Sequence, residues 1–170
     1  MLDADMQRRH LSVDGIKVNI HSMSEAVSSI VSATRAGESF SVCTINLDHV
    51  EKLTREPEFR AAYRRARFVT ADGFPIVALG RLAGVPLKRT TGADLVHPLC
   101  ETAGREEIPI FLLGSSRLTL HRTARRMAAR YPGLTVAGSY SPGPGFDPYS
   151  AEADAAIKMI RKSGARLCFV

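Results

Sequence analysis

The sequence of 170 residues contains no tryptophan, and its aromatic residues amount to only 6%. It has no apolar run near the roughly 18 residues that a membrane-spanning helix requires. Its first ten residues, MLDADMQRRH, contain no apolar stretch of the kind found in secretory leaders. We therefore expect neither a transmembrane segment nor a signal peptide in this sequence, and we expect the protein to be cytoplasmic.

Cysteine is scarce, and the three residues Cys43, Cys100 and Cys168 are odd in number and far apart. This spacing matches no disulfide framework and no zinc motif, so we expect free, core-packed thiols in a reducing compartment. The five histidines show no metal-ligand spacing. An Asp-x-Asp pattern at Asp3 and Asp5 lies in the N-terminal stretch rather than at a strand end, and we discount it. No metal site is expected.

The composition is otherwise that of one globular domain over residues 1–170, with 45% hydrophobic and 24% charged residues. Lys and Arg number 23 against 17 Asp and Glu, which gives a net charge of +6. This excess favours an anionic partner such as a nucleotide, a nucleic acid or an acidic membrane surface. Nucleic acid is the least favoured of these, because aromatics are few and no DNA- or RNA-binding motif accompanies the arginines.

Apolar periodicity and turn residues predict a hairpin followed by alternating strands and helices. Right-handed crossovers between such strands produce a mainly parallel sheet with helices on both faces. The expected fold is therefore α/β and Rossmann-like. We expect a hairpin over 11–20, strands over 40–45, 68–70, 108–113, 134–137 and 166–170, and helices over 23–36, 49–67 with a break near 57, 75–82, 93–103, 118–131 and 151–161.

Polar residues gather where predicted strands end, which is the edge at which parallel sheets bind ligands. Asp72 follows one strand and precedes Gly73, so its carboxylate is a candidate general base. Asp-Gly after a strand is also a common turn or helix N-cap. Thr44 and Asn46 end another strand and can offer hydroxyl and amide groups to a sugar, although Asn46 can equally close its own turn.

Three loops at the same predicted edge are further candidates for ligand binding. Residues 88–94, which include Arg89, form a basic, hydroxyl-rich loop that suits a diphosphate or else simply caps the next helix. Gly114 and Ser115 form a turn like those that hold nucleotide phosphates, but without the glycine fingerprint of dinucleotide folds. The stretch 139–150, which contains Gly145 and Phe146, is a mobile lid or a connector.

Arginines cluster over residues 60–67 and 117–130, both in predicted helices. The second cluster lies opposite an apolar face, so it can meet an anionic lipid surface or form a solvated outer face.

The order and spacing of four segments together resemble the WecG/TagA/CpsF family of bacterial glycosyltransferases, from about residue 13 to residue 170. No single segment is specific, but the combination is. The segments are TINLDHV at 44–50, VTADGFPIV at 69–77, RTTGADL at 89–95 and FLLG at 111–114.

This resemblance implies an enzyme of Rossmann-like fold at the inner face of the cell membrane. It would transfer N-acetylmannosamine, glucose or glucuronic acid from a UDP-sugar to an undecaprenyl-diphosphate-linked acceptor, with inversion and without a metal or other cofactor. By the same resemblance Asp72 is the catalytic base, and Arg89 stabilises the diphosphate leaving group. Thr44 and Asn46 line the sugar pocket. Gly114 and Ser115, together with Gly145 and Phe146, lie near the UDP.

Family members continue after the strand that corresponds to 166–170 with a G-x-G-x-P-x-Q-E segment and a basic C-terminal portion, which this sequence of 170 residues does not contain. Two other hypotheses follow from the residues. One is a non-catalytic α/β module that retains nucleotide binding, and the other is a Rossmann oxidoreductase, which the missing glycine fingerprint disfavours. A homo-oligomer remains open.

Overall fold

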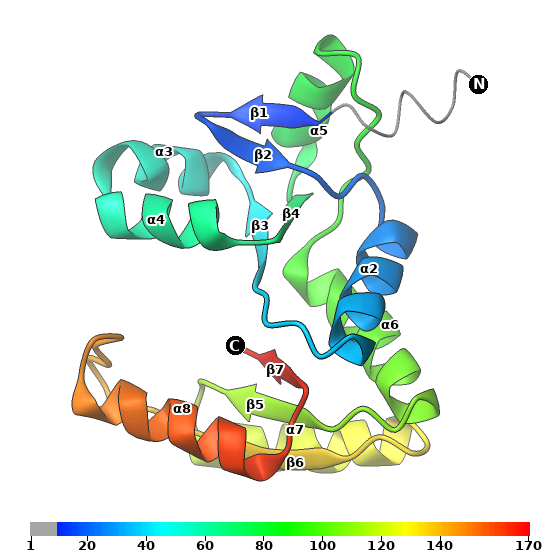
Figure 1. Cartoon of the computed structure of the whole chain (residues 1–170), viewed down its shortest axis with the longest axis vertical. Helices are drawn as coiled ribbons and strands as arrows, with labels where there is room; N and C mark the ends of the chain where they lie inside the picture. The colour runs from blue at the N-terminus through cyan, green and yellow to red at the C-terminus, as the bar shows by residue number, and fades with distance from the viewer. Residues whose placement is uncertain (1–9) are drawn as a thin grey trace. The chain divides into compact units, whose positions relative to one another are not determined.

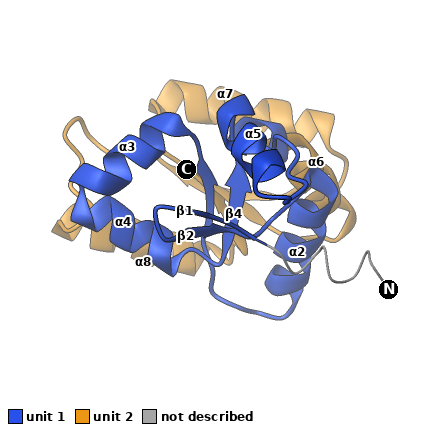
Figure 2. Cartoon of the chain, turned by 90° about the horizontal axis from the view of Figure 1, so that it is seen from above, with its two compact units in different colours: residues 1–95 blue, residues 96–170 orange. Residues whose placement is uncertain are grey.

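A computed structural model describes residues 10–170, which form two compact units divided between Leu95 and Val96 (Figure 2). Both units are α/β with parallel strands, as the sequence predicts (Figure 1). The single domain over residues 1–170 remains a prediction. Residues Asp3 and Asp5 of the Asp-x-Asp pattern lie outside the described residues.

The first unit begins with the predicted hairpin, formed by β1 (Leu11–Val13) and β2 (Ile16–Val18). Asp14 and Gly15 both have positive φ, 49° and 78°, as a two-residue turn between right-twisted strands requires. The other elements of this unit are α2 (Met23–Arg35), β3 (Val42–Ile45), α3 (Leu47–Arg55), α4 (Pro57–Arg65), β4 (Phe68–Ala71), α5 (Phe74–Leu82) and the start of α6 (Gly92–Arg105).

Strands β3 and β4 pair in parallel, with Thr44 opposite Thr70, and Ile20 makes a parallel bridge to Thr70. Helices α3 and α4 lie to one side of this pair, and α2 and α5 lie to the other (Figures 1 and 2). The core beneath joins the hairpin to the sheet through buried aliphatic residues that include Val18, Ile45 and Ile76. Thus the hairpin, the two strands and α5 share one hydrophobic core.

The helix predicted over 23–36 is present as α2, and local signals set its two ends. The Ser22 hydroxyl accepts a hydrogen bond from the Glu25 amide, and the Glu25 carboxylate accepts one from the His21 amide at 2.7 Å. This is a capping arrangement in which the reciprocal donor lies one residue earlier than usual. Gly37, at φ 72°, follows the helix end.

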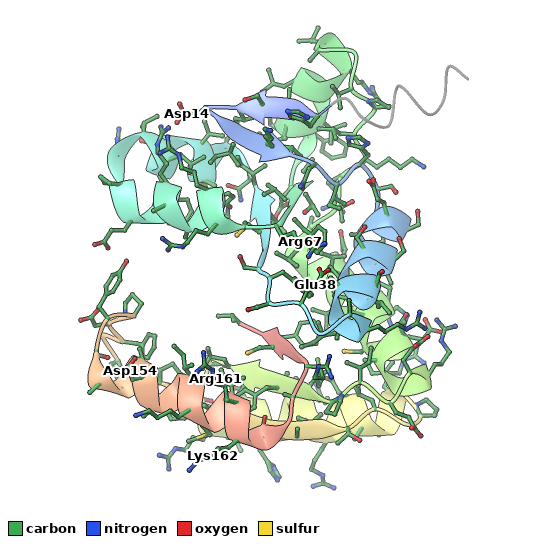
Figure 3. All side chains as sticks on the ribbon, viewed as in Figure 1. Asp14, Glu38, Arg67, Asp154, Arg161 and Lys162 are labelled. Atoms are coloured by element: carbon green, nitrogen blue, oxygen red, sulfur yellow. The ribbon has the colours of Figure 1, made fainter. Side chains whose placement is uncertain are left out.

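Two ion pairs tie distant segments of the first unit together. Arg60 reaches back to Asp14 in the hairpin turn, and Arg67 pairs with Glu38, toward which it points (Figure 3). Both arginines belong to the basic cluster over residues 60–67. At these two positions that cluster therefore has a structural role.

The second unit contains a three-stranded parallel sheet in the order β6–β5–β7, formed by Val136–Tyr140, Ile110–Leu113 and Leu167–Phe169. Helices α7 (Arg117–Arg130) and α8 (Ala151–Ser163) lie on opposite sides of this sheet (Figures 1 and 2). In α8, Asp154 lies in the first turn and Arg161 and Lys162 in the last, which complements the helix dipole (Figure 3).

Gly104 on α6 packs directly against the turn that precedes β6. A methyl group at Gly104 would lie 2.5 Å from the Pro132 carbonyl oxygen. We expect Gly104→Ala to lower the free energy of unfolding by about 1–3 kcal/mol, because backbone atoms have to move apart. Gly143→Ala is the matched control, since its nearest atom would be 3.9 Å away. Denaturant melts measure both, and an unchanged midpoint for Gly104→Ala would refute the tight contact.

Several expected boundaries are wrong. The helix expected from residue 49 already starts at Leu47, because Asn46 caps it. The strand expected from 40 begins at Val42, and the one expected over 134–137 is shifted to Val136–Tyr140. None of the helices within residues 10–170 combines the length and apolar character needed to cross a membrane.

The cysteines are free, as expected, but they are not uniformly in the core. Cys100 is buried, which raises the pKa of its thiol to about 11, whereas Cys43 is half-buried and Cys168 is exposed. Cys168 alternates with the half-buried Leu167 and Phe169 along β7, so its side chain takes the more open face of the strand.

Candidate active site

The Asp72 carboxylate and the Thr44 hydroxyl meet where the two parallel strands of the first unit end. Thr44 Oγ1 donates a hydrogen bond to Asp72 Oδ2 at 3.2 Å. Both side chains are partly exposed. One carboxylate oxygen is thus held by Thr44, and no described residue donates a hydrogen bond to the other.

The strand register explains why these residues meet. Ile45 pairs with Ala71, and the Asp72 amide extends this ladder by donating to the Ile45 carbonyl at 2.8 Å. Gly73 then adopts φ 105° and ψ 152°, a region that side chains with a Cβ avoid. The chain can therefore turn at once into α5 and leave Asp72 on the edge of the sheet.

Asp72 could also have been a helix N-cap, but among the described residues it does not cap α5. Gly73 is the N-cap of α5 and has no side-chain cap hydrogen bond. The hydrogen-bond partner of the Asp72 side chain is Thr44. Its role as a base remains a prediction, but its geometry leaves the carboxylate free for one.

Asn46 closes its own turn and caps α3, which is one of the two roles that the sequence allows for it. Its Oδ1 accepts a hydrogen bond from the His49 amide at 2.9 Å and so caps α3. This bond fixes the side chain at the end of β3, two residues after Thr44. Asn46 is half-exposed, and its Nδ2 has no hydrogen-bond partner among residues 10–170, so its role toward a sugar stays a prediction.

The loop that carries Arg89 is tied to the end of β4 by buried threonines. Thr70 Oγ1 donates to the Thr90 carbonyl at 2.7 Å, and the Thr90 amide donates to the Ala71 carbonyl at 2.8 Å. Both threonines are fully buried. Arg89 is thereby held one residue from a fixed anchor, beside the strand that leads to Asp72.

The N-terminus of α6 adjoins the same edge. Thr91 Oγ1 caps it by accepting from the Asp94 amide at 3.0 Å, and a methyl group at Gly92 would lie 3.6 Å from Thr44 Cγ2. Arg89 also pairs with Asp94 across 3.1 Å, with both side chains about half exposed. The helix N-terminus and the guanidinium are both groups that favour an anion on this side of the edge.

Two further residues, Tyr63 and His49, contact the backbone of Thr44, and neither was predicted from the sequence. The Tyr63 hydroxyl donates to the Thr44 carbonyl at 2.5 Å, and His49 Nδ1 lies 2.8 Å from the same oxygen. Burial is the main cause that raises the pKa of Tyr63, and the nearby Cys43 thiol and Asp72 carboxylate raise it further. The tyrosine therefore stays protonated and holds the backbone at Thr44.

Two hydrogen bonds join the turns that follow β5 and β6 in the second unit. The Gly114 amide donates to the Tyr140 carbonyl at 3.0 Å, and Ser141 Oγ donates to the Ser115 carbonyl at 2.6 Å. Gly114 and Ser115 have positive φ, 110° and 55°. Ser116 then caps α7 through the Thr119 amide. Gly114 and Ser115 thus form a sharp turn whose shape suits close approach of a ligand.

The stretch 141–150 follows β6 and contains Gly145, at φ 75°, and the half-buried Phe146. Glu152 anchors its first part, because one carboxylate oxygen accepts from the Gly143 amide at 3.1 Å and from the Tyr140 hydroxyl at 2.8 Å. These two bonds lower the pKa of Glu152. No sequence motif indicates this anchor.

We expect Glu152→Gln to loosen residues 141–150, because an amide oxygen accepts these two bonds more weakly than a carboxylate. Since the pKa of Glu152 is lowered by folding, the anchoring is fully present above its ordinary value of 4.5 and is lost as the pH falls through the lowered one. Hydrogen exchange of the Gly143 amide measures both effects. Equal protection in variant and wild type at neutral pH would contradict them.

The predicted site residues therefore fall into two groups. Thr44, Asn46, Asp72 and Arg89 come together at one edge of the first unit, whereas Gly114, Ser115, Gly145 and Phe146 lie on adjoining loops of the second. Within residues 10–170, no three His, Cys, Asp or Glu side chains form a cluster able to hold a metal ion.

Comparison with known proteins agrees with the resemblance seen in the four segments. Residues 11–170 match the model of the Glycosyl transferase WecG/TagA/CpsF family. A relative in Bacillus spizizenii, an N-acetylglucosaminyldiphosphoundecaprenol N-acetyl-beta-D-mannosaminyltransferase, is 29% identical over 103 residues. That match covers 60% of this chain and 40% of the relative, so the chain spans less than half of the relative's length in the match. The chain belongs to the WecG/TagA/CpsF family of glycosyl transferases.

Proposed function

We propose that this chain carries the catalytic base of an inverting glycosyltransferase. It would move a hexose or N-acetylhexosamine from a UDP-sugar to an acceptor linked to undecaprenyl diphosphate, in the assembly of a cell-surface polysaccharide. N-acetylmannosamine is the first candidate sugar, because the Bacillus spizizenii relative is named for its transfer. Glucose and glucuronic acid are the others.

The observation that carries this proposal is the Asp72 carboxylate, held by Thr44 at 3.2 Å beside the N-terminus of α6. A direct displacement needs a base on the acceptor side and positive charge on the leaving-group side. One edge of the first unit presents both, in a chain whose family performs glycosyl transfer. Asp72 supplies the base, and Arg89 and the α6 amides supply the charge.

In the proposed step, Asp72 takes the proton of the acceptor hydroxyl while the oxygen of that hydroxyl attacks the anomeric carbon of the donor. The bond from that carbon to the UDP oxygen breaks on the opposite side, and both of its electrons leave with UDP. Thr44 keeps the carboxylate oriented by occupying one of its oxygens. Asn46 contacts the sugar through its amide nitrogen.

The diphosphate that leaves carries negative charge that has to be balanced. Arg89 suits this task, because its guanidinium can donate two parallel hydrogen bonds to phosphate oxygens. The present partner of Arg89, Asp94, is about half exposed and can be exchanged for phosphate. We propose that the contact of Arg89 with the diphosphate replaces a metal ion. Gly114, Ser115, Gly145 and Phe146 would bind the nucleotide.

A transfer assay tests the proposal. The protein is incubated with UDP-N-acetylmannosamine, UDP-glucose or UDP-glucuronic acid and a short-chain N-acetylglucosaminyl diphosphate lipid that dissolves in water, with EDTA present. We expect one donor to yield a disaccharide product at a rate that EDTA does not change. UDP binding without transfer from any donor would instead indicate a non-catalytic nucleotide-binding module. Loss of transfer in EDTA would refute the metal-free step.

A further inference from the structure

Helix α5 presents large apolar side chains to solvent directly after the candidate base. Phe74 is 78% exposed, Leu79 is 43% exposed and Leu82 is 86% exposed. Pro75 and Ala78 are exposed between them. Exposed apolar side chains that gather on one element mark an interaction surface more often than scattered ones do.

The opposite side of the same helix is well packed. Ile76, Val77 and Gly80 are buried. A methyl group at Gly80 would lie 2.9 Å from Leu87 Cδ1 and from the Val85 carbonyl oxygen. The helix is thus firmly held by the core of the first unit and has a second apolar face that packing within residues 10–170 leaves uncovered.

The charged residues of α5 and of the loop that follows it are all basic. Between Asp72 and Asp94 the sequence contains no acidic residue and three basic ones, Arg81, Lys88 and Arg89. All three side chains are exposed, and neither Arg81 nor Lys88 has an ion-pair partner among the described residues. A partner that complements this surface is apolar inside and anionic at its rim.

We propose that α5 lies in the interface of a lipid bilayer, with Phe74, Leu79 and Leu82 at the acyl boundary and Arg81 and Lys88 among anionic headgroups. An apolar face bordered by Lys and Arg is the usual pattern of helices that lie on membranes. The inference rests on the proposed function, because that function places the acceptor in a membrane.

This orientation brings the base to its substrate. The nine residues of α5 form a helix about 14 Å long, and its first residue, Phe74, follows Asp72 by two positions. With α5 at the bilayer surface, Asp72 lies at the headgroup level. A polyprenyl-linked acceptor carries its diphosphate and sugar at the same level. The lipid then needs no deep protein tunnel to bring its sugar hydroxyl to Asp72.

Vesicle co-sedimentation tests the proposal with the full chain and vesicles of phosphatidylcholine and phosphatidylglycerol. The variant is Leu79→Gln with Leu82→Gln, which keeps a good helix former at two exposed positions. We expect it to bind at least about tenfold more weakly than wild type, because apolar side chains leave the acyl boundary. Ile157→Gln, at a 47% exposed residue of α8, is the matched control and should bind like wild type.

The exposed arginines of α7 provide the rival surface. If Arg122→Ser with Arg125→Ser abolishes vesicle binding while the α5 variant binds like wild type, α7 meets the membrane and the proposal is overturned. The proposal is equally overturned if the α5 variant changes the sedimentation coefficient of the protein but not its vesicle binding, since α5 then contacts a second copy.

The water-soluble acceptor separates this inference from the proposed function. We expect the α5 variant to retain wild-type transfer to that acceptor, and to lose transfer to a long-chain acceptor in vesicles. Wild-type transfer to both acceptors would overturn the role of α5 and leave the proposed function standing. Absence of transfer by wild type would refute the proposed function, while α5-dependent vesicle binding in the same preparation would still support the membrane face.

Discussion

Asp72→Asn should reduce turnover by roughly two to four orders of magnitude. The asparagine side chain has the same shape and can still accept the hydrogen bond from Thr44, so the fold and the edge geometry should persist. It cannot take the proton of the acceptor hydroxyl. We therefore expect kcat to fall while the affinity for UDP, measured by titration calorimetry, stays near that of wild type.

Asp48→Asn is the matched control, since Asp48 is an exposed carboxylate in the first turn of α3, two residues after Asn46. It should keep near-normal turnover. If Asp72→Asn also kept near-normal turnover, Asp72 would not be the base. A large loss of UDP affinity in Asp72→Asn would indicate that the carboxylate organises the nucleotide site instead.

Arg89→Ala should reduce kcat by roughly two to three orders of magnitude and weaken UDP binding as well. The reason is that the charge which develops on the leaving diphosphate loses its strongest donor. Arg89→Lys should recover part of the rate, because an ammonium supplies charge but not the paired hydrogen bonds of a guanidinium. Steady-state kinetics with the water-soluble acceptor measure both variants.

The control for this prediction is Arg55→Ala. Arg55 is also an exposed arginine in a surface ion pair, with Glu51 at 2.8 Å, but it lies at the end of α3. Its loss should leave kcat and UDP affinity unchanged. Equal effects of the two alanine variants would show only a general response to net charge, and unchanged kinetics in Arg89→Ala would remove it from the reaction.

Much of the fold was predictable because its signals are local. The Asp14–Gly15 turn, the Ser22 cap and Gly37 after α2 each act within a few residues, and they bound the hairpin and the helix that the sequence predicts over 11–20 and 23–36. Strands that alternate with helices leave few arrangements besides a parallel sheet. The α/β class therefore followed from the order of the elements.

The wrong boundaries have a common origin in competing short-range interactions. The helix was expected to start at residue 49, yet the Asn46 side chain binds the His49 amide and α3 starts at Leu47. Residues 134–135 are apolar or β-branched, but pairing with β5 begins at Val136, opposite Ile110. Strand ends depend on the partner strand, which a single segment does not reveal.

The candidate site was predictable only in part. The strand-end rule and the family resemblance indicated Asp72, Thr44 and Arg89, and the structure brings their segments to one edge. The supports were not predictable. Tyr63 reaches Thr44 from α4, and Glu152 binds Gly143 from α8, contacts that arise from tertiary packing and have no sequence motif.

The central claim is a direct displacement promoted by one base at the Asp72 edge, and the anomeric configuration of the product tests it most directly. The protein is incubated with the α-linked UDP-sugar and the water-soluble acceptor, and proton NMR of the purified disaccharide gives the configuration of the new bond. We predict a β-linked product. An α-linked product would show retention, and would contradict the single-step mechanism assigned to Asp72.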